Sequence, residues 1–242
     1  MRPDVLTHLD EDWGKALAVV AHPDDMEFGL AAAVARWTRQ GKHVVYCMVT
    51  SGEAGIDGME PAQAGPLREE EQREACRIVG VSDVVFLREA DGILEYGLHL
   101  RRRIAHQIRI HRPDIVITNN FRENWMGGGL NQADHIATGQ ATLDAVRDAG
   151  NRWVFADQIS DGGLQPWNGV RQVWLPGSPQ ETHAVDVTET LDDGDASLRA
   201  HRAYLEGLGQ EFDFPAMIKQ SARETGARLG VEYAAGVEVL EP

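Results

Sequence analysis

The chain has 242 residues, a length that allows one large α/β domain or two small ones. Its formal net charge is -15 at pH 7, which disfavours binding to phosphate backbones and to anionic lipid surfaces. Hydrophobic residues make up 43% of the chain and charged residues 25%, as in an ordinary globular protein. We therefore expect a folded protein that binds neither nucleic acid nor membranes.

The N-terminal segment MRPDVLTHLDEDWGKA is polar and lacks the apolar core of a signal peptide. No apolar run approaches the roughly 20 residues that a membrane span requires. Cys47 and Cys76 each lie among apolar residues, as reduced thiols in a protein core do. These features predict a soluble, cytoplasmic protein.

Short apolar runs alternate with stretches of helical periodicity in the first half of the chain. The runs typical of buried strands are 16–21, 43–50, 83–87 and 114–119. The stretches between them that favour helices are 30–40, 67–79 and 97–111. Apolar strands joined by helices indicate a parallel sheet that is covered on both faces. The sequence therefore predicts a Rossmann-like, doubly wound α/β fold with a mostly parallel sheet.

Beyond residue 119 the pattern is less regular. We expect a helix over 132–149, further strands over 153–159 and 170–175, and a helix over 197–208. The tail from Gln210 carries no clear pattern. No internal repeat, low-complexity tract or linker interrupts the chain, so residues 1–242 are expected to form a single domain.

Residues with metal-binding chemistry follow the first predicted strand, in the segment Ala21-His22-Pro23-Asp24-Asp25. In open parallel sheets, ligands bind beyond the carboxyl ends of the strands. His22 and Asp25 can face one ion across the turn, and an imidazole nitrogen with a carboxylate oxygen suits Zn²⁺. Asp24 between them could take a proton from a metal-bound water, whose pKa falls to about 7. The segment therefore predicts half of a catalytic zinc site.

The same segment has an ordinary structural interpretation. An Asp before a helix can accept hydrogen bonds from free amide groups as an N-cap. Spacing alone favours neither interpretation, whereas the position at the exit of a buried strand favours a site.

A third metal ligand has to come from elsewhere in the chain, and His135 is the best candidate. It follows the predicted strand that ends near Asn119, so its loop should open at the same edge of the sheet. His201 is kept as a residue that could act near the site. The other histidines are expected to be structural or solvated: His8, His43, His99, His106, His111 and His183.

Several motifs now give the chain a resemblance to the PIG-L/LmbE-like N-acetylglucosaminyl deacetylases over roughly residues 15–208. In chain order they are HPDD at 22–25, TSGEAG at 50–55, Arg68 with Glu71, Asp91-Gly92, Arg112-Pro113-Asp114, and Asp134-His135. Each motif alone is weak. Their common order and spacing make the resemblance specific.

The resemblance implies a zinc site formed by His22, Asp25 and His135, with Asp24 as the general base. A set of two histidines and one aspartate also accepts other divalent transition metals, so the native metal stays open. The resemblance further implies that a small N-acyl amino sugar is the substrate.

It also implies that Glu53, Arg68 and Asp91 line the substrate pocket or its surroundings. Each has a structural alternative. Arg68 and Glu71 could form an exposed i,i+3 ion pair, and Glu53 and Asp91 could be turn residues beside glycines.

The chain departs from the family pattern at Gln132, which stands where the family usually has the first His of H-P-D-H. An amide can donate a hydrogen bond to a developing oxyanion but cannot transfer a proton. Losing one such interaction could cost about 3 kcal/mol of transition-state stabilisation. We therefore treat Gln132 and His201 as candidate catalytic residues beside Asp24.

The functional hypothesis is hydrolysis of an N-acyl group, most simply acetyl, from an amino sugar or a glycoside containing one. Trp125 lies in a glycine-rich loop over 121–130, which could be a lid that stacks on the sugar. Three alternatives stay open: an amidase for thiol-cofactor conjugates, a hydratase of an unsaturated acid, and a binding protein with a vestigial site. The sequence also leaves open whether the chain forms a homo-oligomer.

Overall fold

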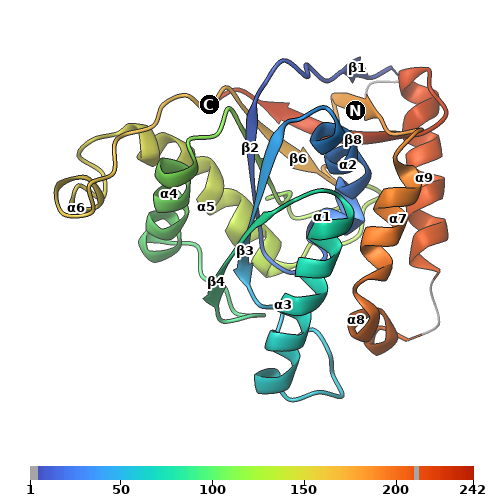
Figure 1. Ribbon diagram of the computed structural model, residues 1–242, viewed down its shortest axis with the longest axis horizontal. Helices are drawn as coiled ribbons and strands as arrows, with labels where there is room; N and C mark the ends of the chain where they lie inside the picture. Colours follow the sequence, from blue (N-terminus) through green and yellow to red (C-terminus); the bar gives the residue numbers. More distant parts are fainter. Residues whose placement is uncertain (1–4, 210–212) are drawn as a thin grey trace.

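The computed structural model describes residues 5–209 and 213–242, and within them the strands form one sheet in the order β1-β7-β8-β6-β5-β2-β3-β4 (Figure 1). The strands are β1 (Thr7–His8), β2 (Lys15–Val20), β3 (His43–Thr50), β4 (Asp83–Glu89), β5 (Ile115–Thr118), β6 (Gln172–Pro176), β7 (His183–Asp186) and β8 (Ala234–Leu240). Every neighbouring pair is parallel except the two that involve β8. The predicted mostly parallel α/β sheet is confirmed.

Helices cover the sheet on both sides. They are α1 (Asp25–Gly29), α2 (Ala31–Arg39), α3 (Pro61–Ile78), α4 (Leu98–His111), α5 (Ala133–Gly150), α6 (Asp157–Ser160), α7 (Leu191–Arg199), α8 (Arg202–Gly207) and α9 (Phe214–Leu229). The helices predicted over 30–40, 67–79, 97–111 and 132–149 correspond to α2, α3, α4 and α5. Helix α4 ends at His111, and the next residue, Arg112, has a left-handed φ of 52° directly before Pro113, as the predicted stop requires.

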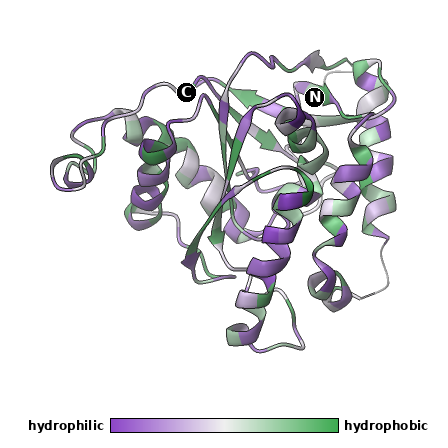
Figure 2. Ribbon diagram, viewed as in Figure 1, coloured by the Kyte–Doolittle hydropathy of each residue, from purple (hydrophilic) through white to green (hydrophobic). Residues whose placement is uncertain are grey.

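Two apolar cores lie on opposite faces of the sheet, and β2 contributes to both. Ala16 and Ala18 pack with α2 and α3 in one core, whereas Leu17 and Val19 pack with α4 and α5 in the other. Figure 2 shows the central strands largely green and much of α3 purple, as expected for buried strands and an exposed helix surface. Cys47 and Cys76 are free and buried, one in each core.

The position of β2 determines where a ligand can bind. From β2 the chain proceeds outward through β3 and β4, and it then returns to place β5 and β6 on the other side of β2. The loops after β2 and β5 therefore diverge to opposite faces and leave a crevice between these two strands. Such a switch point is the usual ligand site of doubly wound sheets.

The strand predicted over 153–159 does not form. This segment contains turns and the short helix α6, and Trp153 is 80% exposed. Among the described residues, the carbonyl groups of this segment do not pair with a neighbouring strand. The buried guanidinium of Arg109 donates hydrogen bonds to the carbonyls of Val154 and Phe155 instead. The apolar run was therefore misleading, because a buried arginine organises the segment as a loop.

The helix predicted over 197–208 is interrupted. Helix α7 ends at Arg199, and α8 begins at Arg202 after His201, whose ψ of 58° is not helical. The side chain of His201 is fully buried, and its Nε2 lies 3.5 Å from Oε2 of Glu27. The turn at His201 thus allows a polar side chain to enter the protein between the two helices.

The C-terminal part adds an antiparallel strand that the sequence pattern did not reveal. The predicted start of the unassigned tail, Gln210, lies outside the described residues. Helix α9 is capped by Asp213, which accepts the N–H of Ala216 at 3.1 Å, and β8 then pairs between β6 and β7. None of the helices in the described ranges has the length and apolarity required to cross a bilayer.

Candidate metal centre

The turn after β2 has an unusual backbone. Asp24 has φ of 95°, a left-handed conformation that is uncommon for residues other than glycine. The turn is closed by Asp25, whose Oδ2 accepts the N–H of His22 at 2.9 Å. Asp24 directly precedes α1, yet its side chain accepts no hydrogen bond from the helix. The N-cap interpretation of Asp24 is therefore wrong, and this carboxylate serves another partner.

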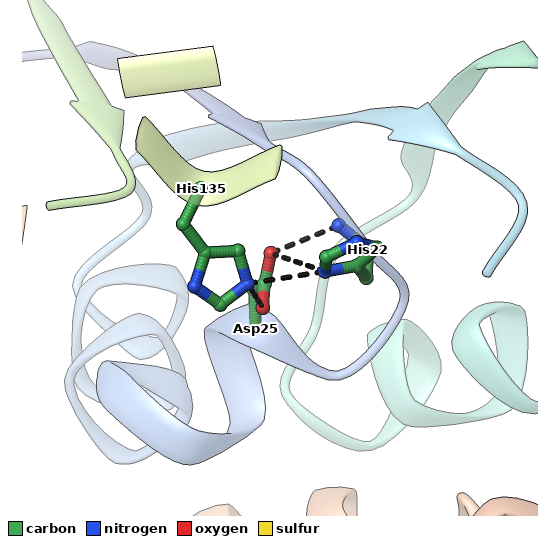
Figure 3. Close-up of side chains that lie close together, drawn as sticks. All are labelled: His22, Asp25 and His135. Atoms are coloured by element: carbon green, nitrogen blue, oxygen red, sulfur yellow. Dashed lines mark hydrogen bonds and ion pairs between the residues drawn. The ribbon is translucent and has the colours of Figure 1, made fainter. Parts of the chain in front are cut away.

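His22, Asp25 and His135 converge at the carboxyl edge of the sheet (Figure 3). Nδ1 of His22 lies 3.1 Å from Nε2 of His135, and that Nε2 lies 3.0 Å from Oδ1 of Asp25. Ligand atoms of the three residues lie within 4.8 Å of one another, and the side chains are 4–11% exposed. Two imidazoles and one carboxylate are a suitable set for a divalent cation that keeps a position open for water. The residues present thus fit a metal.

The other ring nitrogen of His22 faces two carboxylates. Nε2 lies 3.0 Å from Oδ1 of Asp91 and 3.4 Å from Oδ2 of Asp134, which also accepts the N–H of Gly92 at 2.7 Å. Burial lowers the pKa of His22, but hydrogen bonds with Asp134, Asp25 and Asp91 outweigh it and raise this pKa well above its usual value. In the neutral ring, which a metal ligand must be, the contacts of Nε2 with Asp91 and Asp134 hold the single proton on Nε2 and leave Nδ1 free to bind the ion.

Asn119, at the end of β5, orients Asp25. Its Nδ2 donates to Oδ2 of Asp25 at 3.0 Å, and its Oδ1 accepts the N–H of Ala21 at 2.8 Å. Burial raises the pKa of Asp25, but the charge of His135 and hydrogen bonds from both histidines hold it well below its usual value. Asp25 is therefore a carboxylate whose direction is fixed by the neighbouring strand.

Arg68 of α3 binds the turn from the side, and only 2% of this residue is exposed. Its Nη2 donates to Oδ2 of Asp24 at 2.7 Å and to the carbonyl of Pro23 at 2.6 Å. Its Nη1 donates to the carbonyl of Gly52 at 2.9 Å. A Cβ at Gly52 or Gly55 would lie 2.3 Å from Nη1, so the guanidinium occupies space that only these glycines leave. Arg68 thus forms a buried pair with Asp24.

The carboxyl group of Asp24 has an unusual pKa. Burial raises it, the charge of Arg68 lowers it, and the charge of Asp25 raises it again. The pKa of Asp24 is raised to about 6 as a result. A carboxyl group with a pKa in this range can both accept and return a proton near neutral pH.

Glu53 and Asp91, which the family resemblance places near the substrate, connect the loops after β3 and β4. Glu53 accepts the N–H of Asp91 at 3.0 Å and that of Ser51 at 3.2 Å. Asp91 in turn accepts the N–H of Ala54 at 2.8 Å. These two carboxylates therefore make the wall of the site rigid.

The remaining candidate residues, Trp125, Gln132 and His201, differ in their burial and in their contacts. The ring of Trp125 meets the ring of His135 edge-on at a centroid distance of 5.2 Å, and Met126 next to it donates its N–H to the carbonyl of Gly177 at 3.1 Å. Gln132 is exposed at the N-terminus of α5. His201 contacts Glu27 and is not among the groups whose ligand atoms converge.

Sequence reasoning missed three groups that the structure brings to the site. Asn119 was signalled by its place at the end of a strand, and Asp134 by its place beside His135. Tyr204 of α8 had no such signal, because it reaches the site from a distant part of the chain. Its ring covers the guanidinium of Arg68, with Cζ 3.9 Å from the ring centroid.

The fold and this geometry define an α/β protein with a buried metal-type site at the switch point of a parallel sheet. The model of the PIG-L family, described as GlcNAc-PI de-N-acetylase, matches residues 17–146, which is more than half of the chain. The chain therefore belongs to the PIG-L family.

Relatives of known name agree with this membership. Diacetylchitobiose deacetylase of Thermococcus kodakarensis is 28% identical, over 95% of this chain and 84% of the relative. 1D-myo-inositol 2-acetamido-2-deoxy-alpha-D-glucopyranoside deacetylase of Acidothermus cellulolyticus is 30% identical, over 90% of this chain and 86% of the relative. The solved structure of N,N'-diacetylchitobiose deacetylase from Pyrococcus horikoshii has a TM-score of 0.86 at 22% identity, covering 96% of this chain and 85% of that one, which shows a shared fold.

Proposed function

We propose that the chain is a zinc-dependent N-deacetylase that removes an acetyl group from a small amino sugar or a glycoside containing one. The observation that carries the proposal is the position of Asp24, a buried carboxyl with a pKa of about 6 directly beside the convergent group of His22, Asp25 and His135. The two relatives described above are named as deacetylases of acetamido sugars, which supports this substrate class.

His22, Asp25 and His135 would hold the zinc ion. When bound, zinc supplies a Lewis acid that polarises the acyl oxygen and makes the attacking water more acidic. The protein contributes fixed ligands: Asp91 and Asp134 hold the proton of His22 on Nε2, and Asn119 directs Asp25.

Asp24 is the proposed general base and then the general acid. Its carboxylate accepts a proton from the attacking water, and the same carboxyl returns that proton to the nitrogen of the leaving amine. Arg68 keeps the carboxylate oriented through the 2.7 Å bond to Oδ2. One group can serve in both directions because its pKa lies near the working pH.

Gln132 and Trp125 would contact the substrate at the mouth of the site. Gln132 is exposed at the N-terminus of α5, where its amide can donate to the acyl oxygen and where the helix dipole favours negative charge. Trp125 stands edge-on to His135 and could offer its face to a sugar ring. The glycines at 127–129 give its loop the freedom to close.

The setting of this activity is also part of the proposal. The sheet takes strands from both ends of the chain, which supports a single domain. The two free, buried thiols support a reducing compartment such as the cytoplasm. The charge of -15 supports a small substrate in preference to nucleic acid or an anionic membrane.

The test is acetate release from N,N'-diacetylchitobiose by the purified full chain, with metal content measured in parallel by plasma mass spectrometry. We expect turnover, with about one zinc per chain that is largely lost in His135→Ala and fully retained in His183→Ala, a histidine outside the site.

Other outcomes would point to the competing functions. Metal without acetate release, together with loss of the ultraviolet absorbance of an unsaturated acid, would indicate a hydratase. Metal with cleavage only of amides of thiol conjugates would indicate the amidase. A wild-type chain that takes up no zinc would contradict the proposal and leave the vestigial binding protein.

A further inference from the structure

Helix α3 binds one peptide group of the metal-site turn at both of its polar atoms. The carbonyl of Pro23 accepts a hydrogen bond from Nη2 of Arg68 at 2.6 Å. The N–H of Asp24, which belongs to the same peptide bond, donates to Oε1 of Gln72 at 2.9 Å. Arg68 and Gln72 lie one turn apart on α3, so their side chains leave the helix on one face. A single helix therefore holds the Pro23–Asp24 peptide at its oxygen and at its nitrogen.

The side-chain amide of Gln72 has a defined orientation. It is fully buried, and its Nε2 donates to Oε1 of Glu27 in α1 at 3.2 Å. A carboxylate accepts hydrogen bonds and a backbone N–H donates one, so the amide fits between Glu27 and Asp24 in one orientation. Oγ of Ser197 in α7 lies 3.2 Å from the same Oε1 of Glu27. Gln72 thus belongs to a buried network that joins the turn to α3, α1 and α7.

The orientation of this peptide group determines the backbone conformation of Asp24. Rotation of the peptide plane changes ψ of Pro23 and φ of Asp24 together, and the φ of 95° is a left-handed value that aspartate seldom adopts. If the peptide turned over, its carbonyl would leave Arg68 and its N–H would leave Gln72. Both groups are buried, and a buried polar group without a partner is costly. The two hydrogen bonds therefore oppose the strain of the left-handed residue.

From this geometry we infer that Gln72 is a positioning residue for the metal centre, an inference that rests on the proposed function. Asp24 separates His22 from Asp25, so its backbone conformation decides whether these two proposed ligands face one ion. The same conformation places the carboxylate of Asp24 beside them. Gln72 selects this conformation before a metal binds. It acts through the backbone of Asp24 and is not itself a ligand.

The experiment compares Gln72→Met with Gln158→Met on the full chain. Methionine nearly conserves the volume of the side chain and removes its amide. Gln158 is the matched control, because its buried amide also bridges two partners. It accepts from Nη1 of Arg109 at 2.7 Å and donates to the carbonyl of Arg102 at 2.9 Å. Both variants should lose stability, since each leaves buried polar groups without a partner, but only Gln72→Met should affect the metal centre.

The first readout is the dissociation constant of zinc, measured by competition with a chelator. When the peptide is free to turn over, only part of the metal-free population has its ligands in place, and the apparent affinity falls in proportion. We expect about tenfold weaker zinc binding in Gln72→Met and a change below about twofold in Gln158→Met. At saturating zinc, kcat for N,N'-diacetylchitobiose should fall about tenfold in Gln72→Met with KM changed less than about twofold, since the base is held less firmly. If the two variants bind zinc equally well, the inference is overturned while the deacetylase proposal stands.

A second readout needs neither turnover nor metal. Amide hydrogen exchange of the metal-free proteins, followed by NMR, reports directly on the N–H of Asp24. This amide should exchange at least about tenfold faster in Gln72→Met than in Gln158→Met, whereas the N–H of Thr50, which donates to the carbonyl of Ala21 at 2.9 Å, should exchange alike in both. Equal rates at Asp24 would contradict the inference. If the wild type binds no zinc or releases no acetate, the proposed function fails, and amide exchange alone decides whether Gln72 holds the turn.

Discussion

Arg68 and Arg109 are both about 2% exposed, yet they lie in very different surroundings. Arg68 lies at the carboxyl edge of the sheet and its guanidinium is paired with the carboxylate of Asp24. Arg109 lies near the end of α4, and its guanidinium donates to neutral oxygens alone among the described residues. These acceptors are the carbonyls of Asp148, Ala149, Asn151, Val154 and Phe155 and the side-chain Oε1 of Gln158.

The comparison shows two uses of a buried cation. At Arg109 the charge organises a loop that lacks secondary structure, and burial lowers the pKa of this arginine because no carboxylate lies in direct contact. At Arg68 the positive charge lowers the pKa of the neighbouring buried carboxyl of Asp24 and so opposes the effect of burial. Stability should therefore depend mainly on Arg109, and turnover mainly on the Asp24–Arg68 pair.

The largest expected effect is that of Asp24→Asn. Asparagine tolerates the left-handed backbone at this position, so the turn should be retained. Loss of the base should lower kcat by roughly 10³-fold, equivalent to about 4 kcal/mol. Steady-state acetate release and zinc content measure the two properties. A variant that keeps most of its activity would contradict the assignment of the base.

Arg109→Met should have the next largest effect, and on stability. The substitution keeps an apolar stem but leaves several buried carbonyls without a donor, at a cost of about 3 kcal/mol in the free energy of unfolding. Because Arg109 lies near the amino ends of the strands, kcat of the folded fraction should stay within about twofold of wild type. Urea unfolding and kinetics below the transition would test this. A large loss of kcat without destabilisation would invalidate the comparison.

The same conservative substitution at both arginines sharpens the contrast. An ammonium cannot match the fork by which Arg68 binds Asp24, Pro23 and Gly52, so Arg68→Lys should lower kcat about 30-fold, or about 2 kcal/mol. Arg109→Lys should destabilise the protein and leave kcat nearly unchanged. Measuring both variants under identical conditions makes each the control of the other. Equal losses of kcat would mean that Arg68 has no special connection with the chemistry.

Local sequence patterns predicted the parallel half of the fold and the convergent residues of the site. Residues 16–119 alternate between apolar runs and helical periodicity, and the site residues His22 and Asp25 follow directly from the first run. His135 could be found because it follows the strand beside β2. Such features are short in sequence or fixed by the rule that parallel strands end at one edge.

The rest depended on contacts between distant segments. The loop at 153–159 has the composition of a strand, and its course depends on contacts with Arg109, 45 residues before Val154. Tyr204 reaches Arg68 because the buried His201 interrupts a helix whose local sequence is continuous in pattern. Strand β8 pairs antiparallel at a position that no local signal specifies. A buried polar side chain changes the path of the backbone, and periodicity does not report its partner.

The smallest expected effect concerns the ion pair between Glu69 and Arg88, in which the side chain of Arg88 is exposed to solvent. Glu69 is 6% exposed and bonds Arg88, whose side chain is 67% exposed, at 2.8 Å. The bond with Arg88 is the main cause that lowers the pKa of Glu69 to about 2. Because the folded pKa is lowered, the pair stabilises the protein above the unfolded pKa near 4.5, and this contribution is lost as pH falls toward 2.

Glu69→Gln should therefore be less stable than wild type at pH 6 by about 1 kcal/mol, a value kept small by the exposure of Arg88. As pH falls from 5 to 2.5, the two free energies of unfolding should converge, since protonation removes the pair from the wild type. Urea unfolding of both proteins across this range is the measurement, with Glu70→Gln as a control because its carboxylate is 73% exposed. Parallel curves would mean that the ionised Glu69 carboxylate gains no stability from its partner Arg88.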